Sequence, residues 1–443
     1  MKRYYIETYG CQMNVADSEL VSGLMEQSGY VPAESEYEAD AIFLNTCAIR
    51  EHAEEKIHSR LGTLRKLKEG RPETIIGLLG CMAQHVKDDI LEHKSYVDFV
   101  LGPDSYRRLP ALLRRQKETA NSIVDTRLSR FEVYENLYPS RNEGINAWVS
   151  IMRGCDKFCT FCIVPFTRGR ERSRIMASIV EEVEQAVAQG FVEITLLGQN
   201  VNSYRSEGSR FPELLHAVSE VPAVERIRFT SPHPQDVDDE MLFVMRDRPN
   251  ICNSVHLPLQ AGSDRILNRM NRTYTKSEFI SLAERIRHIL PGCGLSTDII
   301  AGFPGETEEE FAQTLEVMER VNFDSAFTFK YSPRPGTKAE EYSNHISEEV
   351  KQGRLQQLIE LQARHTLERN QNEIGKTVKV LVEKESKKSS ADWAGRTDNN
   401  KWVIFPKGAA QIRDLTDVRI VAAKGVSLFG ELAQIGEMPH AVA

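Results

Sequence analysis

The sequence lacks long hydrophobic runs: no apolar stretch approaches the roughly 18 residues that a membrane-spanning helix requires. It also has no apolar leader, because the first residues, MKRYYIETYGCQ, pass directly into a predicted strand. An excess of positive charge is missing too, since 56 Lys and Arg face 64 Asp and Glu, a net charge of −8. That balance argues against a protein that coats nucleic acid over its whole surface. These absences predict a cytoplasmic protein without a membrane segment.

What is present is enough chain for two to three domains, because 443 residues exceed one ordinary core. The charge is uneven. Residues 376–443 carry 11 Lys and Arg against 8 Asp and Glu, and TRGRERSR at residues 167–174 is locally basic. Local positive charge is what phosphate binding requires, although a solvated, ion-paired face gives the same pattern.

The most informative motif is GCDKFCTFC, in which Cys155, Cys159 and Cys162 lie within eight residues. Three thiolates on one short loop can hold three corners of a 4Fe-4S cube and leave one iron open. A redox-sensing or zinc-binding cluster is the alternative, but zinc needs a fourth ligand from elsewhere. The CxxxCxxC loop resembles the signature of radical S-adenosylmethionine (SAM) enzymes. That resemblance implies SAM bound at the open iron and cleaved by one electron to a 5′-deoxyadenosyl radical.

Residues 1–120 alternate strand and helix patterns, which predicts a parallel α/β domain. Three predicted strands lead directly to Cys11, Cys47 and Cys81, which are 36 and 34 residues apart. Because the carboxyl ends of parallel strands lie at one sheet edge, these thiols are predicted to converge as a second three-cysteine site. Three buried cysteines that only pack are the alternative.

Residues 141–372 repeat the strand–helix rhythm about six times, which predicts a central partial (β/α)6 barrel with its chemistry at the strand ends. The CxxxCxxC loop follows the first of these strands. Residues 374–438 change to strand-period alternation, which predicts a small antiparallel β-barrel. In it Trp393, Trp402 and Phe405 can either stack on RNA bases or fill the barrel. The predicted fold class is therefore α/β with a C-terminal β-barrel.

All three segments, in this order, resemble the methylthiotransferase family of radical-SAM enzymes. The resemblance rests on YGCQMN, LNTCAIRE and GLLGCMAQ around the three N-terminal cysteines, on the CxxxCxxC loop and on the barrel, which resembles a TRAM RNA-binding domain. It implies an auxiliary 4Fe-4S cluster on Cys11, Cys47 and Cys81 and a radical-SAM 4Fe-4S cluster on Cys155, Cys159 and Cys162.

Within that family, YGCQMNVADSE and CIVPFTRGRERSR are most similar to members that modify tRNA. The resemblance implies methylthiolation of carbon 2 of N(6)-isopentenyladenosine next to the anticodon, with two SAM molecules and a sulfur donor. Threonylcarbamoyladenosine in tRNA and an aspartate of a ribosomal protein remain alternative substrates. A non-catalytic iron–sulfur protein that binds RNA or transfers electrons is the alternative from another class.

Further contacts follow from the resemblance. The expected SAM-binding residues are Phe161, Gly198, Gln199, Asn200, Ser231, His233, Gln260 and Asp298. The expected tRNA-binding residues are Arg168, Arg170 and Trp402. No catalytic side chain is expected beyond the cluster ligands, and Cys252 and Cys293 are interpreted as structural. The implied partners are the tRNA anticodon stem-loop, an electron donor of flavodoxin or ferredoxin type and the iron–sulfur assembly machinery, with the chain itself a monomer.

Overall fold

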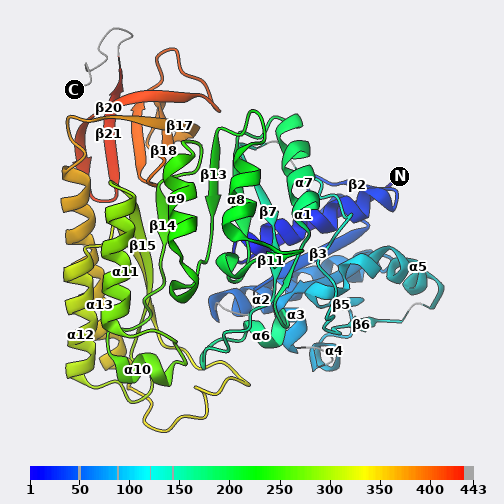
Figure 1. Ribbon diagram of the computed structural model, residues 1–443. Helices are drawn as coiled ribbons and strands as arrows, with labels where there is room; N and C mark the ends of the chain where they lie inside the picture. Colours follow the sequence, from blue (N-terminus) through cyan, green and yellow to red (C-terminus); the bar gives the residue numbers. More distant parts are fainter. Residues whose placement is uncertain (48–50, 87–88, 120, 142–143, 434–443) are drawn as a thin grey trace. The chain divides into compact units, whose positions relative to one another are not determined.

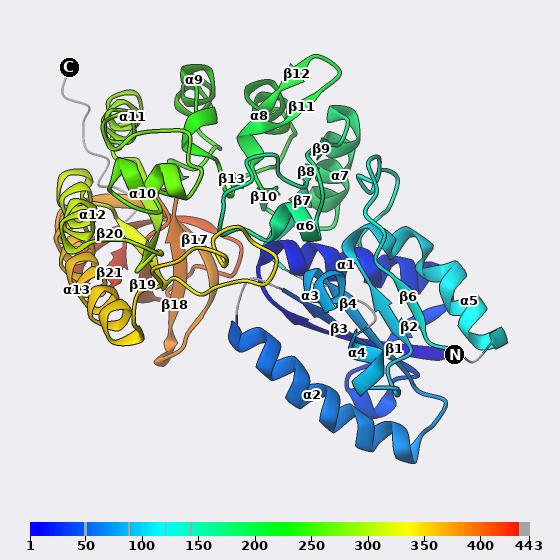
Figure 2. The ribbon, with the colours of Figure 1, turned by 90° about the horizontal axis from the view of Figure 1, so that it is seen from below.

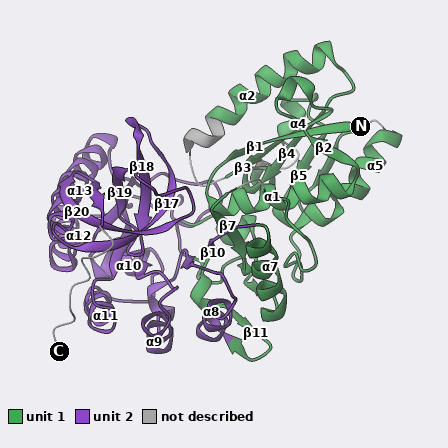
Figure 3. Cartoon of the chain, turned by 90° about the horizontal axis from the view of Figure 1, so that it is seen from above, with its two compact units in different colours: residues 1–158, 162–189, 195–209 green, residues 159–161, 190–194, 210–443 purple. Residues whose placement is uncertain are grey.

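The computed structural model describes residues 1–47, 51–86, 89–119, 121–141 and 144–433. They divide into two compact units (Figure 3). Unit 1 holds residues 1–158, 162–189 and 195–209, and unit 2 holds residues 159–161, 190–194 and 210–443. Each unit is described by itself below.

Unit 1 begins with a parallel sheet of six strands, which Figure 1 draws in blue to cyan. The strand order is β2-β1-β3-β4-β5-β6. Its strands are β1 (Lys2–Tyr9), β2 (Tyr30–Pro32), β3 (Ala41–Thr46), β4 (Ile75–Gly80), β5 (Phe99–Leu101) and β6 (Ile123–Asp125). Its helices are α1 (Gln12–Gln27), α2 (Glu51–Gly70), α3 (Cys81–Val86), α4 (Asp89–His93) and α5 (Leu109–Thr119). The predicted parallel α/β architecture is confirmed, and the short strands β2 and β6 are additions to it.

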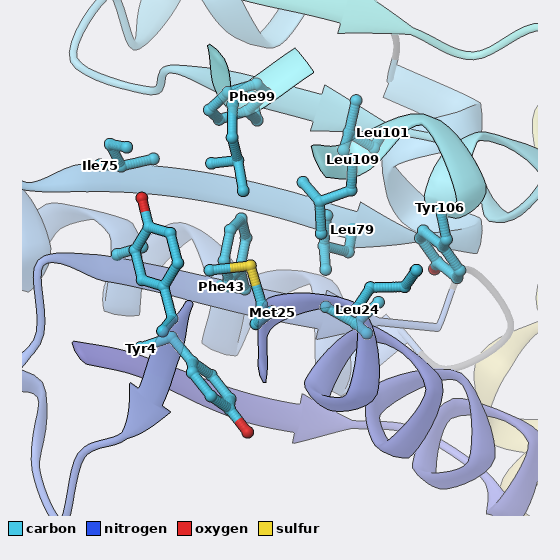
Figure 4. Packing of buried hydrophobic residues seen from close by; sticks show 14 of the residues in the cluster. Tyr4, Leu24, Met25, Phe43, Ile75, Leu79, Phe99, Leu101, Tyr106 and Leu109 are labelled. Atoms are coloured by element: carbon cyan, nitrogen blue, oxygen red, sulfur yellow. The ribbon is translucent and has the colours of Figure 1, made fainter. Parts of the chain in front are cut away.

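Residue alternation along the central strands explains why helices cover both faces of this sheet. Ala41 and Phe43 pack with α1 on one face, whereas Ile42 and Leu44 pack with α2 on the other. Figure 2 shows α1 and α2 on these opposite sides of the sheet. The α1 face is filled by large side chains, among them Phe43, with the others labelled in Figure 4. Two such cores fix the strand ends of the sheet in place.

The rest of unit 1 carries the first part of the central segment. Its elements are β7 (Asn146–Ser150), β8 (Met152–Arg153), α6 (Val164–Thr167), β9 (Arg172–Ser173), α7 (Met176–Ala188) and β11 (Arg205–Ser206). Strand β10 (Glu193–Leu197) belongs to unit 1 from Thr195 onward. β7 lies beside β10, and β8 pairs with β9 in antiparallel fashion. The short strands β8 and β9 flank the CxxxCxxC loop and hold its two ends together.

Unit 2 continues the alternation through four further strands, of which β14, β15 and β16 form one parallel sheet. The elements are β13 (Arg226–Phe229), β14 (Ser254–His256), β15 (Gly294–Ala301), β16 (Ser325–Lys330), α8 (Phe211–Ser219), α9 (Asp239–Asp247), α10 (Asp264–Arg269), α11 (Lys276–Ile289), α12 (Glu308–Val321) and α13 (Glu348–Gln371). Each of the six strands predicted for the central segment forms, in the predicted strand–helix order. The strand–helix pattern of the sequence therefore identified the architecture of this segment.

The chain ends in a closed five-stranded barrel in the order β17-β18-β19-β21-β20. The strands are β17 (Thr377–Ser386), β18 (Ser389–Thr397), β19 (Trp402–Pro406), β20 (Leu415–Lys424) and β21 (Ser427–Leu432). The barrel is not antiparallel throughout, because β19 and β21 pair in parallel. An odd number of strands cannot close with every neighbouring pair antiparallel, so one parallel pair is unavoidable. Val380, Val403 and Phe405 lie in the barrel core, so Phe405 has the packing role that was one of its two alternatives.

Candidate functional site

Three cysteines follow three neighbouring parallel strands of unit 1. β1, β3 and β4 are adjacent, and Tyr9 pairs with Thr46, which pairs in turn with Gly80. Cys11, Cys47 and Cys81 therefore leave the sheet at the same edge. Cys11 is the N-cap residue of α1, and Cys81 is the first residue of α3. The predicted convergence of these residues agrees with the geometry.

The approach of the chain at this edge is close. A Cβ placed on Gly10 would come within 2.9 Å of Cys47 Cβ and 2.3 Å of Asn14 Oδ1. The Cys47 amide donates to the Tyr9 carbonyl at 2.9 Å. Glycine at position 10 thus lets the loop after β1 run directly against the loop after β3.

The three thiols differ in their electrostatic surroundings. A hydrogen bond with Cys47, opposed by burial and helped by Arg168, lowers the pKa of Cys11 to about 6. Burial raises the pKa of the Cys81 thiol, and the nearby Arg168 opposes that shift. The Arg168 Nε–H donates to Cys81 Sγ at 3.2 Å, and Nη2 donates to Asp17 Oδ2 at 2.7 Å. A fixed cation therefore faces this cluster of thiols.

These thiols fit a thiolate-ligated iron–sulfur group. A thiolate is the metal-binding form of cysteine, and a neighbouring cation favours it. Arg168 Nη1 is buried and has no hydrogen-bond partner among the described residues, so a further acceptor can be accommodated there. No group of three or more His, Cys, Asp or Glu side chains in the described part of the chain is arranged around a single metal ion. A cube that spreads its ligands over three irons does not require that arrangement.

The second cysteine set lies on the loop between β8 and α6. Gly154 opens this loop with a φ of +76°, and a Cβ there would come within 2.0 Å of the Arg170 carbonyl oxygen. The Cys155 amide donates to the Gly169 carbonyl at 3.1 Å, which ties the two ends of the loop together. In unit 2, Arg272 Nη1 donates to Cys159 Sγ at 3.4 Å. A glycine-dependent loop thus presents its cysteines, one of them facing an arginine.

The LLGQN segment after β10 lies beside the start of that loop in unit 1. The Gly154 amide donates to Gln199 Oε1 at 2.5 Å. A Cβ on Gly198 would come within 2.6 Å of Met152 Cγ, so a side chain at position 198 would displace the Met152 side chain. Asn200 is buried, and its Nδ2 donates to Glu171 Oε1 at 3.5 Å. The side chains of Gln199 and Asn200 thus hold the segment against Gly154 and Glu171.

Unit 2 holds the other expected SAM contacts: Ser231 and His233 follow β13, Gln260 follows β14, Asp298 lies within β15 and Phe161 lies on the cysteine loop. Ser231 and Gln260 are non-glycine residues with φ of +57° and +69°. A left-handed backbone conformation is uncommon at residues other than glycine, and it occurs more often at functional sites than elsewhere. The backbone N–H of Gln260 also donates to the Asp298 carbonyl at 2.8 Å, so these two expected residues lie on adjacent backbone segments.

The side chains of the remaining residues of this group have other partners. Asp298 Oδ2 lies 3.2 Å from His256 Nε2. His233 is buried, accepts from the Gln235 amide at 3.2 Å and packs edge-on against Tyr274. Phe161 lies edge-on to Phe303 at 6.5 Å. These contacts leave the SAM-binding roles of the group as predictions.

The residues expected to bind tRNA have different exposures. Arg168 is 3% exposed and directed at Asp17 and Cys81, which does not suit contact with a phosphate. Arg170 is exposed and pairs with Asp156, with an Nε–Oδ1 distance of 2.5 Å. Trp402 is partly exposed on the barrel, with Lys384 Nζ 4.4 Å and Arg396 5.7 Å from its ring. Trp402 therefore presents an aromatic ring beside Lys384, whereas the nearby Arg396 is paired with Glu193 and Glu383.

Sequence reasoning did not find Asp17 or Arg272, although both border a cysteine set. Asp17 lies on α1 within the quoted YGCQMNVADSE, but an acidic residue in a helix is ordinarily a solvated one. Arg272 lies far from any cysteine in sequence. Only the fold brings these residues to the sulfur atoms, so no spacing rule could have found them.

Family models match three parts of the chain. They are an uncharacterised protein family, UPF0004, over residues 3–102, the radical SAM superfamily over residues 149–318 and the TRAM domain over residues 371–433. Among the described residues, no helix is long and apolar enough to cross a membrane. Two cysteine sets, a strand–helix core and a terminal barrel thus define a radical-SAM protein with a TRAM domain.

Relatives narrow the assignment. A tRNA-2-methylthio-N(6)-dimethylallyladenosine synthase of Bacteroides fragilis is 49% identical over 438 residues, covering 97% of this chain and 95% of that protein. The synthase of the same name from Acetivibrio thermocellus is 45% identical over 440 residues, covering 98% and 91%. The chain therefore belongs to the tRNA-2-methylthio-N(6)-dimethylallyladenosine synthase family.

Solved structures share the fold at much lower identity. The radical SAM methyltransferase TsrM from Kitasatospora setae matches with a TM-score of 0.57 and 15% identity over 77% of both chains. The cobalamin-dependent radical SAM enzyme OxsB matches with a TM-score of 0.54 and 12% identity, over 82% of this chain and 56% of that one. At these identities the likeness is one of fold.

Proposed function

We propose that this chain methylthiolates carbon 2 of N(6)-isopentenyladenosine next to the anticodon of tRNA, as the names of its relatives describe for them. The observation that carries the proposal is the meeting of Cys11, Cys47 and Cys81 at one sheet edge, together with the CxxxCxxC loop in the same chain. One cysteine set would suffice for a radical enzyme. A second set in the same chain supports a reaction that also inserts sulfur.

The ligands follow from the two sets. Cys11, Cys47 and Cys81 hold an auxiliary 4Fe-4S cluster, and Cys155, Cys159 and Cys162 hold the radical-SAM 4Fe-4S cluster. When bound, the clusters and SAM supply one-electron chemistry and sulfur for a ring carbon whose hydrogen no side-chain base can remove. Two SAM molecules are used in each turnover, one as methyl donor and one as radical source.

The protein's own residues position these groups. Gly154 allows close backbone approach at the cysteine loop, and Gln199 accepts the Gly154 amide hydrogen. Gly198 leaves room for the Met152 side chain. We assign SAM contacts to the segment Gly198–Asn200 and to residues of unit 2. The residues of unit 2 are Phe161, Ser231, His233, Gln260 and Asp298. Their share is to orient SAM and to exclude water from it.

The terminal barrel is proposed to bind tRNA. Trp402 is partly exposed with Lys384 Nζ 4.4 Å from its ring, and such a ring can stack on an unpaired base while Lys384 meets phosphate. Arg396 is instead paired with Glu193 and Glu383. Arg170 is proposed as a second contact, because its side chain is 67% exposed. The proposed domains are residues 1–120, 141–372 and 374–438. We further propose that the protein is a cytoplasmic monomer. A flavodoxin- or ferredoxin-type protein is its electron donor, and the iron–sulfur assembly machinery supplies its clusters.

Activity is tested in cells whose own gene for this protein is deleted and which carry a plasmid copy of the wild-type or a variant chain. The nucleosides of their tRNA are analysed by mass spectrometry. The wild-type chain should restore 2-methylthio-N(6)-isopentenyladenosine, whereas Cys47→Ala and Cys159→Ala should leave only isopentenyladenosine. Cys252→Ala is the matched control, because Cys252 is buried outside both sets. A methylthio group found on a ribosomal protein instead of tRNA would contradict the proposal.

The test of RNA binding compares Trp402→Ala with Val426→Ala in filter binding to an anticodon stem-loop. Loss of a stacked base should weaken binding by about 1–3 kcal/mol. Val426 is 71% exposed in the same barrel, so its truncation should leave affinity unchanged. If the two variants bind the stem-loop with equal affinity, Trp402 does not contact the RNA.

A further inference from the structure

The inference concerns two arginines that donate hydrogen bonds to cysteine sulfurs, and it rests on the proposed function. Arg168 is the first. Its side chain is 4% exposed, its Nε–H donates to Cys81 Sγ at 3.2 Å and its Nη2 donates to Asp17 at 2.7 Å. The Asp17 contact holds the guanidinium plane, so the donor to sulfur is fixed by a second bond.

Arg168 belongs to a buried network of ion pairs that contains more arginines than carboxylates. Three guanidinium groups, of Arg153, Arg168 and Arg172, meet two carboxylates, of Asp17 and Asp104, through N–O distances between 2.7 and 3.7 Å. All five side chains are at most 6% exposed. A buried charge without a counter-charge is costly. Among these five side chains the positive charges exceed the negative ones by one, and Arg168 is the member that donates to Cys81.

Aromatic rings offset part of that cost but supply no negative charge. The Arg153 guanidinium lies 3.7 Å from the centre of the Tyr134 ring. Burial raises the pKa of Tyr134 well above its ordinary value, so this phenol stays neutral. Arg168, the member of the network that donates to Cys81, therefore directs positive charge at the sulfur side of the network.

Arg272 repeats the arrangement at the other cysteine set. Its Nη1 donates to Cys159 Sγ at 3.4 Å, its Nε to the Tyr274 hydroxyl at 3.0 Å and its Nη2 to the Pro258 carbonyl at 3.2 Å. Two neutral acceptors thus fix the guanidinium while its charge faces the sulfur. In each three-cysteine set, an arginine thus donates to one of the sulfurs.

We propose that Arg168 and Arg272 are positioning residues that set the reduction potentials of the auxiliary and the radical-SAM cluster. Each acts through the sulfur that it contacts. Hydrogen bonds to sulfur and local net charge are the means by which a protein tunes an iron–sulfur potential. Reduction adds one electron from a low-potential donor and neither forms nor breaks a bond. The added negative charge is stabilised by the cation, so each arginine raises the potential of its cluster.

The auxiliary cluster is tested in a full-length parent in which Cys155, Cys159 and Cys162 are alanine. After anaerobic reconstitution, the midpoint potential is measured by a dithionite titration followed by electron paramagnetic resonance. Arg168→Gln should shift the midpoint to a more negative potential. Asp17→Asn, which removes the neighbouring negative charge and keeps Arg168, should shift it to a more positive one. The double variant should return close to the parent.

The opposite signs separate charge tuning from a merely structural role. Loosened packing would move both single variants the same way or neither of them, and either result would overturn the inference. Asp17→Asn keeps the test decisive if Arg168→Gln fails to fold. A parent that holds no cluster would overturn the proposed function as well. A parent with a cluster whose potential ignores all three variants would overturn this inference alone.

The radical-SAM cluster is tested in the complementary parent, with alanine at Cys11, Cys47 and Cys81. Arg272→Gln should lower the midpoint potential, and Arg272→Lys, which keeps the charge, should lower it less. Iron content measured on the same samples checks that both variants retain their cluster. If the parent, Arg272→Gln and Arg272→Lys all have the same midpoint potential, Arg272 does not tune the radical-SAM cluster.

Discussion

At the scale of the residue, Gly154 is the position at which the CxxxCxxC loop tolerates a side chain least. Its φ of +76° already disfavours other residues, and a Cβ would meet the Arg170 carbonyl oxygen at 2.0 Å. A backbone atom cannot rotate away as a side chain can. Substitution here must therefore distort the loop itself.

Gly154→Ala should consequently lose the radical-SAM cluster and keep the auxiliary one, leaving roughly half of the iron of the wild-type chain. Iron analysis of anaerobically reconstituted protein gives the measurement. Gly208→Ala is the matched control, since Gly208 has a φ of +87° but no atom within 4 Å of the point that a Cβ would occupy. Full iron content in Gly154→Ala would show that the loop adapts.

Glu310 predicts a pH dependence of stability. Hydrogen bonds from Arg265 are the main cause that lowers the pKa of Glu310 from 4.5 to about 2. Burial of the carboxyl group opposes this shift, and a hydrogen bond from the Thr307 amide adds to it. A lowered pKa in the folded state means that the ionised group stabilises the fold above 4.5. That contribution is lost as the pH falls from 4.5 through 2.

In urea unfolding of the metal-free chain, Glu310→Gln should lower the midpoint most above pH 5, and the gap should close toward pH 2. Glu316→Gln on the same helix is the control, because Glu316 is 61% exposed in its pair with Lys276 and such pairs contribute little. A gap that stays constant over this pH range would contradict the assignment.

At the scale of the element, α11 shows how a sequence signal becomes a helix start. Thr275 Oγ1 accepts from the Glu278 amide at 3.3 Å, and Glu278 Oε2 accepts from the Thr275 amide at 2.8 Å. This reciprocal capping box satisfies two amides that the first turn leaves without partners. The cap lies on the surface, so its contribution can be removed without opening the core.

Thr275→Ala should lower the free energy of unfolding by about 1 kcal/mol. Thr275→Ser keeps the hydroxyl and should stay close to wild type. Urea denaturation of the two variants, followed by circular dichroism, measures the difference. Similar losses in both would assign the effect to the methyl group rather than to the cap.

Elements were predictable to the extent that their signals are local. The strands before Cys47 and Cys81 are buried throughout and apolar except for Asn45 and Thr46, as expected where both faces of a sheet are covered. Their place in a parallel sheet brings the cysteines together. The pairing of β19 with β21 was not predictable from alternation. Alternation shows which residues face inward but does not specify the neighbouring strand.

At the scale of the whole molecule, the limit of prediction is sequence distance. Cys81 and Asp17 are 87 and 151 residues from the arginine that contacts both of them. The basic TRGRERSR stretch therefore suggested a surface for phosphate, whereas Arg168 and Arg172 are buried. Composition reports that a segment is charged, and only the fold determines whether its partner is solvent, an acid or a sulfur.

The attachment of the barrel to the rest of unit 2 also depends on a buried charge. Asp324 lies 2.8 Å from Lys401 Nζ, just before β19, and 3.1 Å from Arg369 Nη2 on α13. It also accepts from the Leu295 amide of β15 at 3.0 Å. Lys401 is only 6% exposed, so its ammonium depends on this carboxylate. One side chain thus connects a helix, a sheet and the barrel.

Asp324→Asn should cost about 3–5 kcal/mol, because it leaves a buried lysine without its counter-charge. The barrel tryptophans Trp393 and Trp402 should then report unfolding at lower urea than the helical circular dichroism does. Asp417→Asn is the control, since its pair with Lys379 is exposed and should contribute at most about 1 kcal/mol. If the two signals still coincide in Asp324→Asn, the barrel is held to the core by packing and not by this charge.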